Sequence, residues 1–469
     1  MGVIERTQGT AELEVLDPAT GEAIGRIPAG STEAAHAAVC RARAASAAWA
    51  RTDPAERAAM LKAGARTLRA QARELAELQT RENGKPLADS AGGVEAGIAA
   101  IEQYAELGPL HRGRSLQGSW DATDLMVHEP RGVVALLVPW NDPVAIACGQ
   151  IAAALVTGNA VVFKPSEKTP LTGERIVELL DIPGEALQLL HGDARSGRPL
   201  AGHDCVDLVV HTGSVQTGRE VARACAGRLG KALLELGGKD ALIVDAGVDP
   251  EWAADQAALG AFANAGQICT SVERIYVHEE VAEPFLHALA RRAQTLRVGS
   301  GMDPDSEMGP LIDDEQRMWV HRHVQDAVSD GAALLAGGEL PDGPGFFYPP
   351  TVIAGPSREA PVLREETFGP VAAVRTVPRF EAALEEAASG EFGLAATVLT
   401  PSQANAQRAW RELPVGTVKV NAVFGGAPGG AAEPRRRSGI GFGYGPELLD
   451  EMTHTKVVHL APYPGQTRG

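Results

Sequence analysis

The strongest limit on the fold is an alternation of apolar strands and helices in the middle of the chain. Residues 133–138 form an uninterrupted apolar run, which is typical of a strand inside a parallel sheet. Strand-like runs follow at residues 160–164, 188–190 and 208–211, with helical patterns at about 172–180 and from Gly218 onward. This order predicts the βαβ units of a doubly wound parallel sheet. The G-x-G-x-x-G sequence of an ordinary dinucleotide-binding sheet is absent, so the pattern leaves the cofactor open.

The whole chain has 469 residues, which is too long for one core, so we expect two or three domains. A strand pair is predicted at 11–28, and helical patterns extend from there to about Leu107. A second α/β segment runs from about 239 to 436. Strand-like sequences near 125–129 and 456–460 lie outside both α/β segments.

Composition excludes several kinds of partner. The 43 basic and 60 acidic residues give a formal net charge of −17, which argues against nucleic acid and anionic membranes. No apolar run reaches membrane-spanning length, and residues 1–9 lack a signal core, so we expect a cytoplasmic protein. The five cysteines are odd in number and lack C-x-x-C spacing, so neither a disulfide framework nor a metal site is expected.

Two short segments carry the residue types of a covalent mechanism. Cys269 follows a glycine turn in the run 264–270, and Glu235 lies upstream between apolar residues and glycines. A thiolate can attack a carbonyl, and a carboxylate can then draw a proton from water. Taken singly, each residue is more simply a buried structural cysteine or a glutamate at the end of a helix.

Taken together, the two segments resemble the signatures of the aldehyde dehydrogenase superfamily. They are an E-L-G-G-K segment at 235–239 and a G-Q-x-C segment at 266–269, at the separation that the family shows. The similarity covers nearly the whole chain and follows the family's motif order. It implies an α/β fold with two doubly wound parallel-sheet domains and a small β arm for oligomerisation.

The resemblance also implies where the domains lie. Residues 1–111 and 131–237 would form a discontinuous NAD-binding domain, and 238–436 the catalytic domain with the nucleophilic cysteine. Residues 112–130 and 452–469 would form the oligomerisation arm. Its strands would expose their edges in a monomer, and proteins normally cover such edges, so we expect a homodimer or homotetramer.

By resemblance, the reaction is the NAD(P)-dependent oxidation of an aldehyde to a carboxylic acid. Cys269 is the nucleophile, Glu235 activates water, and Asn141 donates to the oxyanion, which an amide at a strand's carboxyl end can do. The cysteine would pass through a thiohemiacetal and a thioester. The thiolate form is required, so the thiol needs a lowered pKa or help from a base.

The cofactor contacts are also implied by matching motifs, and the run 211–218 is close to the family's F-T-G-S segment, with His211 in place of phenylalanine. Taken alone, Lys164 at the end of the strand at 160–164 and Glu167 just after it would be a solvated charge pair. Glu167 would accept hydrogen bonds from ribose hydroxyls and repel a 2′-phosphate, so NAD is expected over NADP, although Lys164 and Ser166 could hold a phosphate. The implied cofactor residues are Trp140, Lys164, Ser166, Glu167, Gly213, Ser214, Leu236, Gly237, Glu366 and Phe368.

The substrate tunnel is expected to have few aromatic walls. By motif matching, its lining includes Asp142, Gly149, Ile268, Thr270 and Gly426. Relatives that take succinic semialdehyde carry arginines at the positions of Gly149 and Ala263, and Asp142 would repel an ω-carboxylate. We therefore expect a bulkier polar aldehyde with an amino or hydroxyl group that Asp142 binds. The alternative is that Asp142 caps a neighbouring backbone N–H.

Other functions stay open at this point. A dehydrogenase that passes its acyl group to coenzyme A typically lacks the glutamate base, but Glu235 is present, and a semialdehyde dehydrogenase is the second alternative. Many relatives carry a glutamate where this chain has Gly443, so a proton relay through that position must differ. The arginine run 435–437 is most simply a solvated or intersubunit loop.

Overall fold

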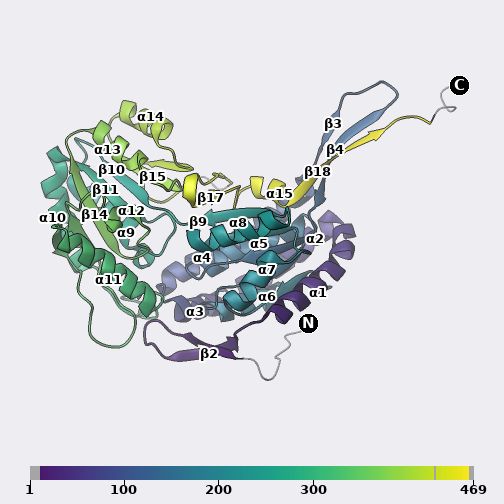
Figure 1. The fold of residues 1–469 in the computed structure, drawn as a ribbon, viewed down its shortest axis with the longest axis horizontal. Coiled ribbons are helices and arrows are strands. Elements are labelled where there is room, and N and C mark those ends of the chain that lie inside the picture. The colour runs from purple at the N-terminus through teal and green to yellow at the C-terminus, as the bar shows by residue number, and fades with distance from the viewer. Residues whose placement is uncertain (1–10, 427–428, 464–469) are drawn as a thin grey trace.

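Two large sheets and a projecting arm form the architecture of the chain (Figure 1). The computed structural model describes residues 11–426 and 429–463. The predicted strand pair is present as an antiparallel sheet of β1 (Glu12–Leu16) and β2 (Ala23–Pro28). The N-terminal helical region contains α1 (Thr32–Arg51), α2 (Pro54–Ala70), α3 (Ala72–Asn83), α4 (Leu87–Leu107) and the short η1 (Gly108–Leu110).

The first large sheet has six strands in the order β17-β9-β8-β5-β6-β7. All neighbours are parallel except the edge strand β17, which is antiparallel to β9. The strands are β5 (Val133–Leu137), β6 (Ala160–Lys164), β7 (Leu187–Leu189), β8 (Leu208–Gly213), β9 (Lys231–Leu236) and β17 (Gly439–Ile440). The helices between them are α5 (Pro143–Val156), α6 (Pro170–Leu180), α7 (Ala194–Gly202) and α8 (Val215–Gly227).

Both faces of this sheet are covered, which explains why its strands are apolar at every position. Successive side chains of a strand point to opposite faces. In β5, Val134 and Leu136 belong to one apolar cluster and Val133 and Ala135 to another. The predicted doubly wound arrangement is therefore present.

The second large sheet has seven strands in the order β12-β13-β14-β11-β10-β15-β16, with only β12 antiparallel to its neighbour. Its strands are β10 (Asp240–Val244), β11 (Val272–His278), β12 (Ala333–Ala336), β13 (Thr351–Ala354), β14 (Val371–Val377), β15 (Ala395–Leu399) and β16 (Thr417–Val420). Its helices are α9 (Pro250–Phe262), η2 (Ala263–Gly266), α10 (Glu279–Thr295), α11 (Asp314–Ser329), α12 (Pro361–Arg364), α13 (Phe380–Ala388) and α14 (Gln403–Glu412). The chain then returns to the first sheet through η3 (Arg436–Ser438) and β17.

A three-stranded antiparallel sheet in the order β18-β4-β3 projects from the body (Figure 1). It contains β3 (Arg114–Leu116), β4 (Thr123–Pro130) and β18 (Thr453–Leu460), which follows the short helix α15 (Glu447–Glu451). The two strand-like sequences that lay outside the α/β segments therefore pair with each other, and the free edges belong to β3 and β18. Val457 of β18 is 65% exposed.

Among the described residues, no helix is both long enough and apolar enough to cross a membrane.

Candidate active site

The loop that carries Cys269 has an unusual backbone conformation. In η2, Asn264 and Ala265 have left-handed φ values of 49° and 54°. Gly266 continues with a φ of 71°, and a Cβ at that position would overlap the carbonyl of Gly369. Such φ values are unfavourable for residues other than glycine, so the surrounding structure imposes this turn. The turn places Cys269 at an exposed position before β11.

A buried glutamine fixes the same loop from within. Gln267 is 1% exposed, and its Oε1 accepts the N–H of Ile312 at 2.9 Å. Its Nε2 donates to the carbonyls of Asn264 at 3.1 Å and Pro310 at 3.3 Å. Because three hydrogen bonds hold this side chain, the backbone just before Cys269 has a defined position.

Asn141 reaches this loop from the other large sheet. It follows β5, is 8% exposed, and donates from Nδ2 to the carbonyl of Gln267 at 3.0 Å. Asn83, at the end of α3, donates to the backbone carbonyl of Trp140 at 3.2 Å and so supports the turn before Asn141. A primary amide has two N–H groups. The structure shows an acceptor for one of them, and the other remains for a ligand beside Cys269.

Glu235 approaches from β9. Burial raises the pKa of its carboxyl to about 8, because the charged form is poorly solvated there. The backbone N–H of Gly443 donates to its Oε1 at 2.9 Å and offsets part of this rise. A pKa near the working pH suits a residue that accepts a proton during a reaction.

The thiol of Cys269 is exposed to solvent but surrounded by carboxyl groups. Burial by the cleft raises its pKa most, and Asp240, Glu235 and Glu366 raise it further. The open surface of the residue moderates this effect, since water can solvate the thiolate. The resting thiol is therefore protonated at neutral pH, and it needs a base to become nucleophilic.

The predicted cofactor residues Lys164 and Glu167 lie at the sheet edge that also carries the segment with Asn141. Lys164 ends β6, and Leu137 of β5 pairs with both Lys164 and His211 of β8. Lys164 is 7% exposed, donates from Nζ to the carbonyl of Pro165 at 2.9 Å, and lies 3.8 Å from Glu167 Oε2. Burial lowers its pKa. The carboxyl ends of parallel strands are where such sheets bind ligands.

The N-terminus of α8 lies at the same edge. Gly213 ends β8, and Ser214 caps the helix by accepting the N–H of Thr217 on Oγ at 3.2 Å. Backbone N–H groups at a helix N-terminus favour a phosphate group. His211 is buried at 6% exposure, and burial lowers its pKa to about 4, so its imidazole is neutral at pH 7.

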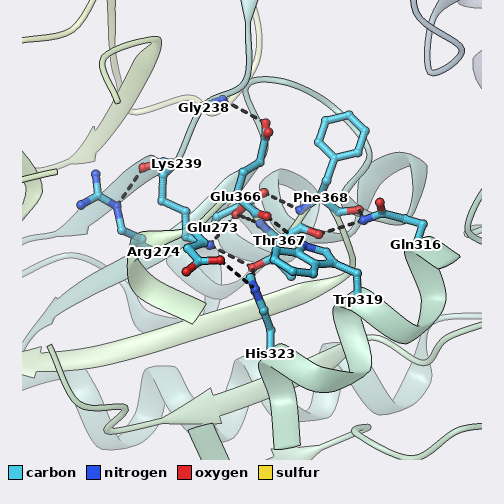
Figure 2. A network of polar contacts seen from close by, with 11 residues as sticks. Gly238, Lys239, Glu273, Arg274, Gln316, Trp319, His323, Glu366, Thr367 and Phe368 are labelled. Atoms are coloured by element: carbon cyan, nitrogen blue, oxygen red, sulfur yellow. Dashed lines mark hydrogen bonds and ion pairs between the residues drawn. The ribbon is translucent and has the colours of Figure 1, made fainter. Parts of the chain in front are cut away.

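A buried polar network holds the loop after α12, as Figure 2 shows. Glu273 accepts the N–H groups of Thr367 at 2.8 Å and Phe368 at 2.9 Å. Lys239 lies 2.5 Å from Glu273 and donates to Thr367 Oγ1 at 2.9 Å. The side chains of Lys239 and Glu273 are only 2% and 4% exposed. This ion pair therefore fixes the backbone on which the predicted cofactor residues Glu366 and Phe368 stand.

Glu366 points back to the segment after β9. Its Oε1 accepts the N–H of Gly238 at 3.0 Å, and a Cβ on Gly237 would overlap its carboxyl group. Burial raises its pKa to about 8, and the charge of Glu273 adds to the rise. Leu236 ends β9 immediately before this contact. Glu366 and the segment Leu236–Gly237 thus lie together, although they belong to different parts of the chain.

Phe368 and Trp140 meet across the cleft. Their ring centroids are 5.5 Å apart at an interplanar angle of 88°. Phe368 has a left-handed φ of 49°, and Gln316 donates to its carbonyl at 3.0 Å. A cavity of about 570 Å³ connects α8 with the Glu366 loop, and its lining consists of Val215, Gln216, Arg219, Glu220, Arg223, Trp319, Glu365, Glu366 and Phe392. The cavity therefore extends from the first large sheet's helix α8 to the loop that carries Glu366.

Asp142 has a partner that neither sequence interpretation anticipated. It occupies the N-cap position of α5 but makes no side-chain capping bond. Its Oδ1 lies 3.4 Å from Nζ of Lys85, whose side chain is 11% exposed. Burial raises the pKa of the neighbouring Asp89, while Lys85 lowers it. Asp142, which follows Asn141 in the chain, thus forms a charged group with Lys85 and Asp89.

The other predicted substrate residues lie in the Cys269 loop, on α5 and in the segment after β16. Ile268 and Thr270 flank Cys269 in sequence and are half-buried. On α5, a Cβ at Gly149 would contact Ala100 at 3.7 Å. Gly426 has a φ of 145°, and a Cβ built there meets nothing within 4 Å. Ile268 and Thr270 are therefore the direct neighbours of the residue that carries the thiol.

Several residues of the site were not singled out from the sequence. Lys239 lies in the quoted E-L-G-G-K segment, but no spacing rule connects it with Glu273. Gln267 is part of the G-Q-x-C segment, yet its role in fixing the loop appears only in three dimensions. The arginine run is bound within the same chain, because Arg436 donates to the carbonyl of Ala388 at 2.9 Å and Arg437 pairs with Glu391.

One group of potential metal ligands occurs among the described residues, at the base of the arm. His111, His128 and Asp450 offer ligand atoms within 4.8 Å of one another. The two imidazole rings stack at 4.2 Å with an interplanar angle of 19°. Their nitrogen lone pairs therefore lie in nearly parallel planes, which does not favour a shared ion.

The geometry defines a two-sheet α/β protein with a cysteine, a carboxyl and an amide meeting between the sheets. The sequence model of the aldehyde dehydrogenase family matches residues 4–458. The chain therefore belongs to the aldehyde dehydrogenase family, and the resemblance and the expected enzyme class are confirmed.

Individual relatives cover almost the whole chain. A betaine aldehyde dehydrogenase from Cereibacter sphaeroides is 36% identical over 466 residues, which is 97% of this chain and 95% of the relative. The betaine aldehyde dehydrogenase of Bacillus subtilis is 34% identical, over 96% of this chain and 94% of its own.

Solved structures agree with the fold. A betaine aldehyde dehydrogenase from Staphylococcus aureus in complex with NAD+ has a TM-score of 0.93 and 32% identity, and the match covers 98% and 94% of the two chains. A lactaldehyde dehydrogenase has a TM-score of 0.95 and 32% identity, with 97% of each chain covered. The predicted aldehyde dehydrogenase-like fold is confirmed.

Proposed function

We propose that this chain oxidises an aldehyde to its carboxylic acid with NAD, through a covalent intermediate on Cys269. The observation that carries the proposal is the hydrogen bond from Asn141 Nδ2 to the carbonyl of Gln267 at 3.0 Å. It places an amide from one sheet beside the thiol loop of the other. A carbonyl carbon attacked by Cys269 would then have its oxygen within reach of the free N–H of Asn141.

The chain's own groups account for the proton and bond changes. The exposed thiol of Cys269 gives its proton to solvent water, and its sulfur adds to the aldehyde carbon. The oxyanion that forms accepts a hydrogen bond from Asn141. A bound nicotinamide supplies the acceptor for the hydride that leaves this carbon. Glu235 takes a proton from water as the C–O bond forms and the C–S bond breaks, which releases the acid and the thiolate.

The residues present fit a bound dinucleotide. Glu366 stands at the cavity that reaches α8, where Ser214 and the free backbone N–H groups suit a pyrophosphate. Trp140, directly before Asn141, and Phe368, two residues after Glu366, have their rings in contact and provide apolar surface. Glu167 lies beside Lys164, and its carboxylate would repel the 2′-phosphate of NADP, which supports NAD as the cofactor. The related enzyme from Staphylococcus aureus binds NAD+.

The proposed substrate is a polar aldehyde that carries an amino group. Two relatives are named betaine aldehyde dehydrogenases, and betaine aldehyde carries a cationic nitrogen group next to its aldehyde. The group of Lys85, Asp89 and Asp142 has one excess negative charge when both carboxyls are ionised, so it attracts a cation more than an anion. No arginine stands at Gly149 or Ala263, which disfavours the semialdehyde alternative.

Domain limits follow the sheets in this proposal. Strands β5 to β9 lie within 131–237, which with 1–111 would be the NAD-binding domain. Strands β10 to β16 lie within 238–436, the proposed catalytic domain. Residues 112–130 and 452–469 would be the arm, of which 464–469 lie outside the described residues.

Pre-steady-state kinetics test the chemistry. The Cys269→Ala variant should give neither a burst of reduced cofactor nor turnover. The Glu235→Gln variant should keep the burst and lose turnover, because acylation needs the base less than hydrolysis does. Full turnover in Cys269→Ala contradicts the mechanism. A wild-type rate that depends on added coenzyme A would favour the acylating alternative.

A panel of aldehydes tests the substrate class. Catalytic efficiency is measured with acetaldehyde, succinic semialdehyde, an aminoaldehyde and a hydroxyaldehyde, in wild type and in Asp142→Asn. The aminoaldehyde should rank first, and Asp142→Asn should reduce that preference. Asp121→Asn, an exposed position on the arm, is the matched control. The proposal is wrong if succinic semialdehyde ranks first or if Asp142→Asn leaves the ranking unchanged.

A further inference from the structure

The segment 441–443, which follows β17, forms a contact surface for the carboxyl of Glu235. The two residues of β17 pair with β9 so that Gly439 stands opposite Glu235 and Ile440 opposite Leu234. This pairing leads the chain alongside the end of β9. The N–H of Gly443 then donates to Glu235 Oε1 at 2.9 Å. In the part of the chain that the structure describes, this is the one hydrogen bond to that carboxyl.

The missing side chain of Gly443 gives Glu235 its room. A Cβ built on Gly443 would overlap Cγ of Glu235 and lie 2.5 Å from Oε1, closer than real Cβ atoms come. The φ of Gly443 lies outside the left-handed region, so its backbone accepts any residue. In this chain, the side chain of Glu235 therefore occupies the space that a side chain at position 443 would need.

Two further carboxyl groups anchor the same segment. The N–H of Gly441 donates to Glu433 Oε1 at 3.3 Å, and the N–H of Phe442 donates to Glu451 Oε1 at 3.3 Å. Glu451 also pairs with Lys231, the first residue of β9. The segment is thus tied to the strand that carries Glu235, so the N–H of Gly443 has a fixed place relative to the carboxyl.

We infer that Gly443 is a positioning residue, whose N–H and open space hold the ionised carboxylate of Glu235 ready to accept a proton from water. The inference rests on the proposed role of Glu235 as the base. An N–H donor favours the charged form of a carboxyl group. Gly443 therefore keeps a larger fraction of the base ionised than burial alone would allow.

The groups that face Glu235 support this assignment. The thiol of Cys269 and the phenol of Tyr444 are titratable groups that interact with Glu235. Both groups are neutral at pH 7, because their pKa values are raised. The neighbouring strands place Thr212 and Gly439 beside Glu235, and neither is charged. The Gly443 N–H is thus the contact that lowers the pKa of the base.

The test is the pH dependence of turnover in Gly443→Ala. The added methyl group should displace Glu235, and the acid limb of the kcat profile should move up by about one pH unit. Turnover at pH 7 should fall about tenfold, while the burst of reduced cofactor stays. Gly202→Ala is the control, because a Cβ there meets nothing within 4 Å. A profile that coincides with the wild-type profile overturns the inference.

A double-mutant comparison separates positioning from a structural role. If Gly443→Ala acts through Glu235, it should change turnover less than about twofold in the Glu235→Gln background. An equal effect in both backgrounds overturns the inference. Wild-type turnover in Glu235→Gln would instead contradict the proposed function.

Amide exchange provides a readout that does not require Gly443→Ala to fold. The backbone N–H of Gly443 should exchange faster in Glu235→Ala than in the wild type, because its acceptor is removed. Peptides covering 441–444 report this by mass spectrometry. Unchanged exchange means that the hydrogen bond is absent in solution and refutes the assignment.

Discussion

Removal of the buried carboxylate of Glu273 should weaken both the fold and NAD binding. Glu273 is the partner of Lys239 and the acceptor for the N–H groups of Thr367 and Phe368 (Figure 2). Glu273→Ala leaves a lysine that is 2% exposed with only Thr367 Oγ1 as an acceptor. Breaking a buried pair in this way costs about 3–5 kcal/mol. Two unpaired N–H groups add about 1–3 kcal/mol each where water cannot reach them.

The same change should affect the cofactor because Glu366 and Phe368 stand on this loop. A displacement of about 1 Å at a binding group can lower catalytic efficiency roughly 100-fold. We therefore expect a loss of about 10- to 100-fold in kcat/KM for NAD, with KM raised. Urea unfolding followed by tryptophan fluorescence measures stability, and Trp319 is a local probe because its Nε1 donates to the carbonyl of Glu366 at 3.1 Å.

A surface pair provides the comparison for this prediction. Glu251 lies 2.6 Å from Arg291, and the two side chains are 55% and 51% exposed. Exposed pairs contribute about 0–1 kcal/mol, so Glu251→Ala should unfold at nearly the wild-type urea concentration. If Glu273→Ala is as stable as Glu251→Ala and keeps the wild-type KM for NAD, the reasoning about the buried pair is refuted.

Four further outcomes are expected. Asn141→Ala should lower kcat about 10²–10³-fold in a steady-state assay, the usual loss for one oxyanion donor, and a loss under threefold would exclude that role. Because the pKa of Glu235 is raised to about 8 and the base must be ionised, turnover should rise roughly tenfold from pH 7 to 9, and Glu235→Gln should abolish this limb. Catalytic efficiency should be higher with NAD than with NADP, and Glu167→Ser should narrow the difference; a wild-type preference for NADP argues against the role of Glu167. Light scattering should show a dimer or tetramer, and Val457→Asp on the arm should weaken it, whereas a stable wild-type monomer at micromolar concentration contradicts this expectation.

The sequence was sufficient for the strands and the family because both depend on local signals. Apolar runs such as 133–138 mark buried parallel strands whatever their neighbours, and β5 is found there. Cys269 and Glu235 were recognised because glycine-containing motifs surround them. Asn141 was recognised because it follows an apolar strand.

Long-range contacts were outside the reach of sequence patterns. Asp142 was expected to bind the substrate or cap a backbone N–H, but Lys85 pairs with it, and the two are far apart in the sequence. The arginine run is exposed, as a solvated loop would be, but the contacts of Arg436 with Ala388 and of Arg437 with Glu391 could not be read from the sequence. These partners depend on how separate elements meet, which local propensity and spacing do not encode.

The return of the chain through β17 has a consequence for synthesis of the protein. Glu235 and its contact at Gly443 are separated by 208 positions, and the whole second sheet is made between them. During translation the base therefore gains its partner only after residue 443 has left the ribosome. Truncated chains that end before β17 would carry Cys269 without a correctly held base. Such chains should keep the burst of reduced cofactor but turn over more slowly at pH 7 than chains that include Gly443.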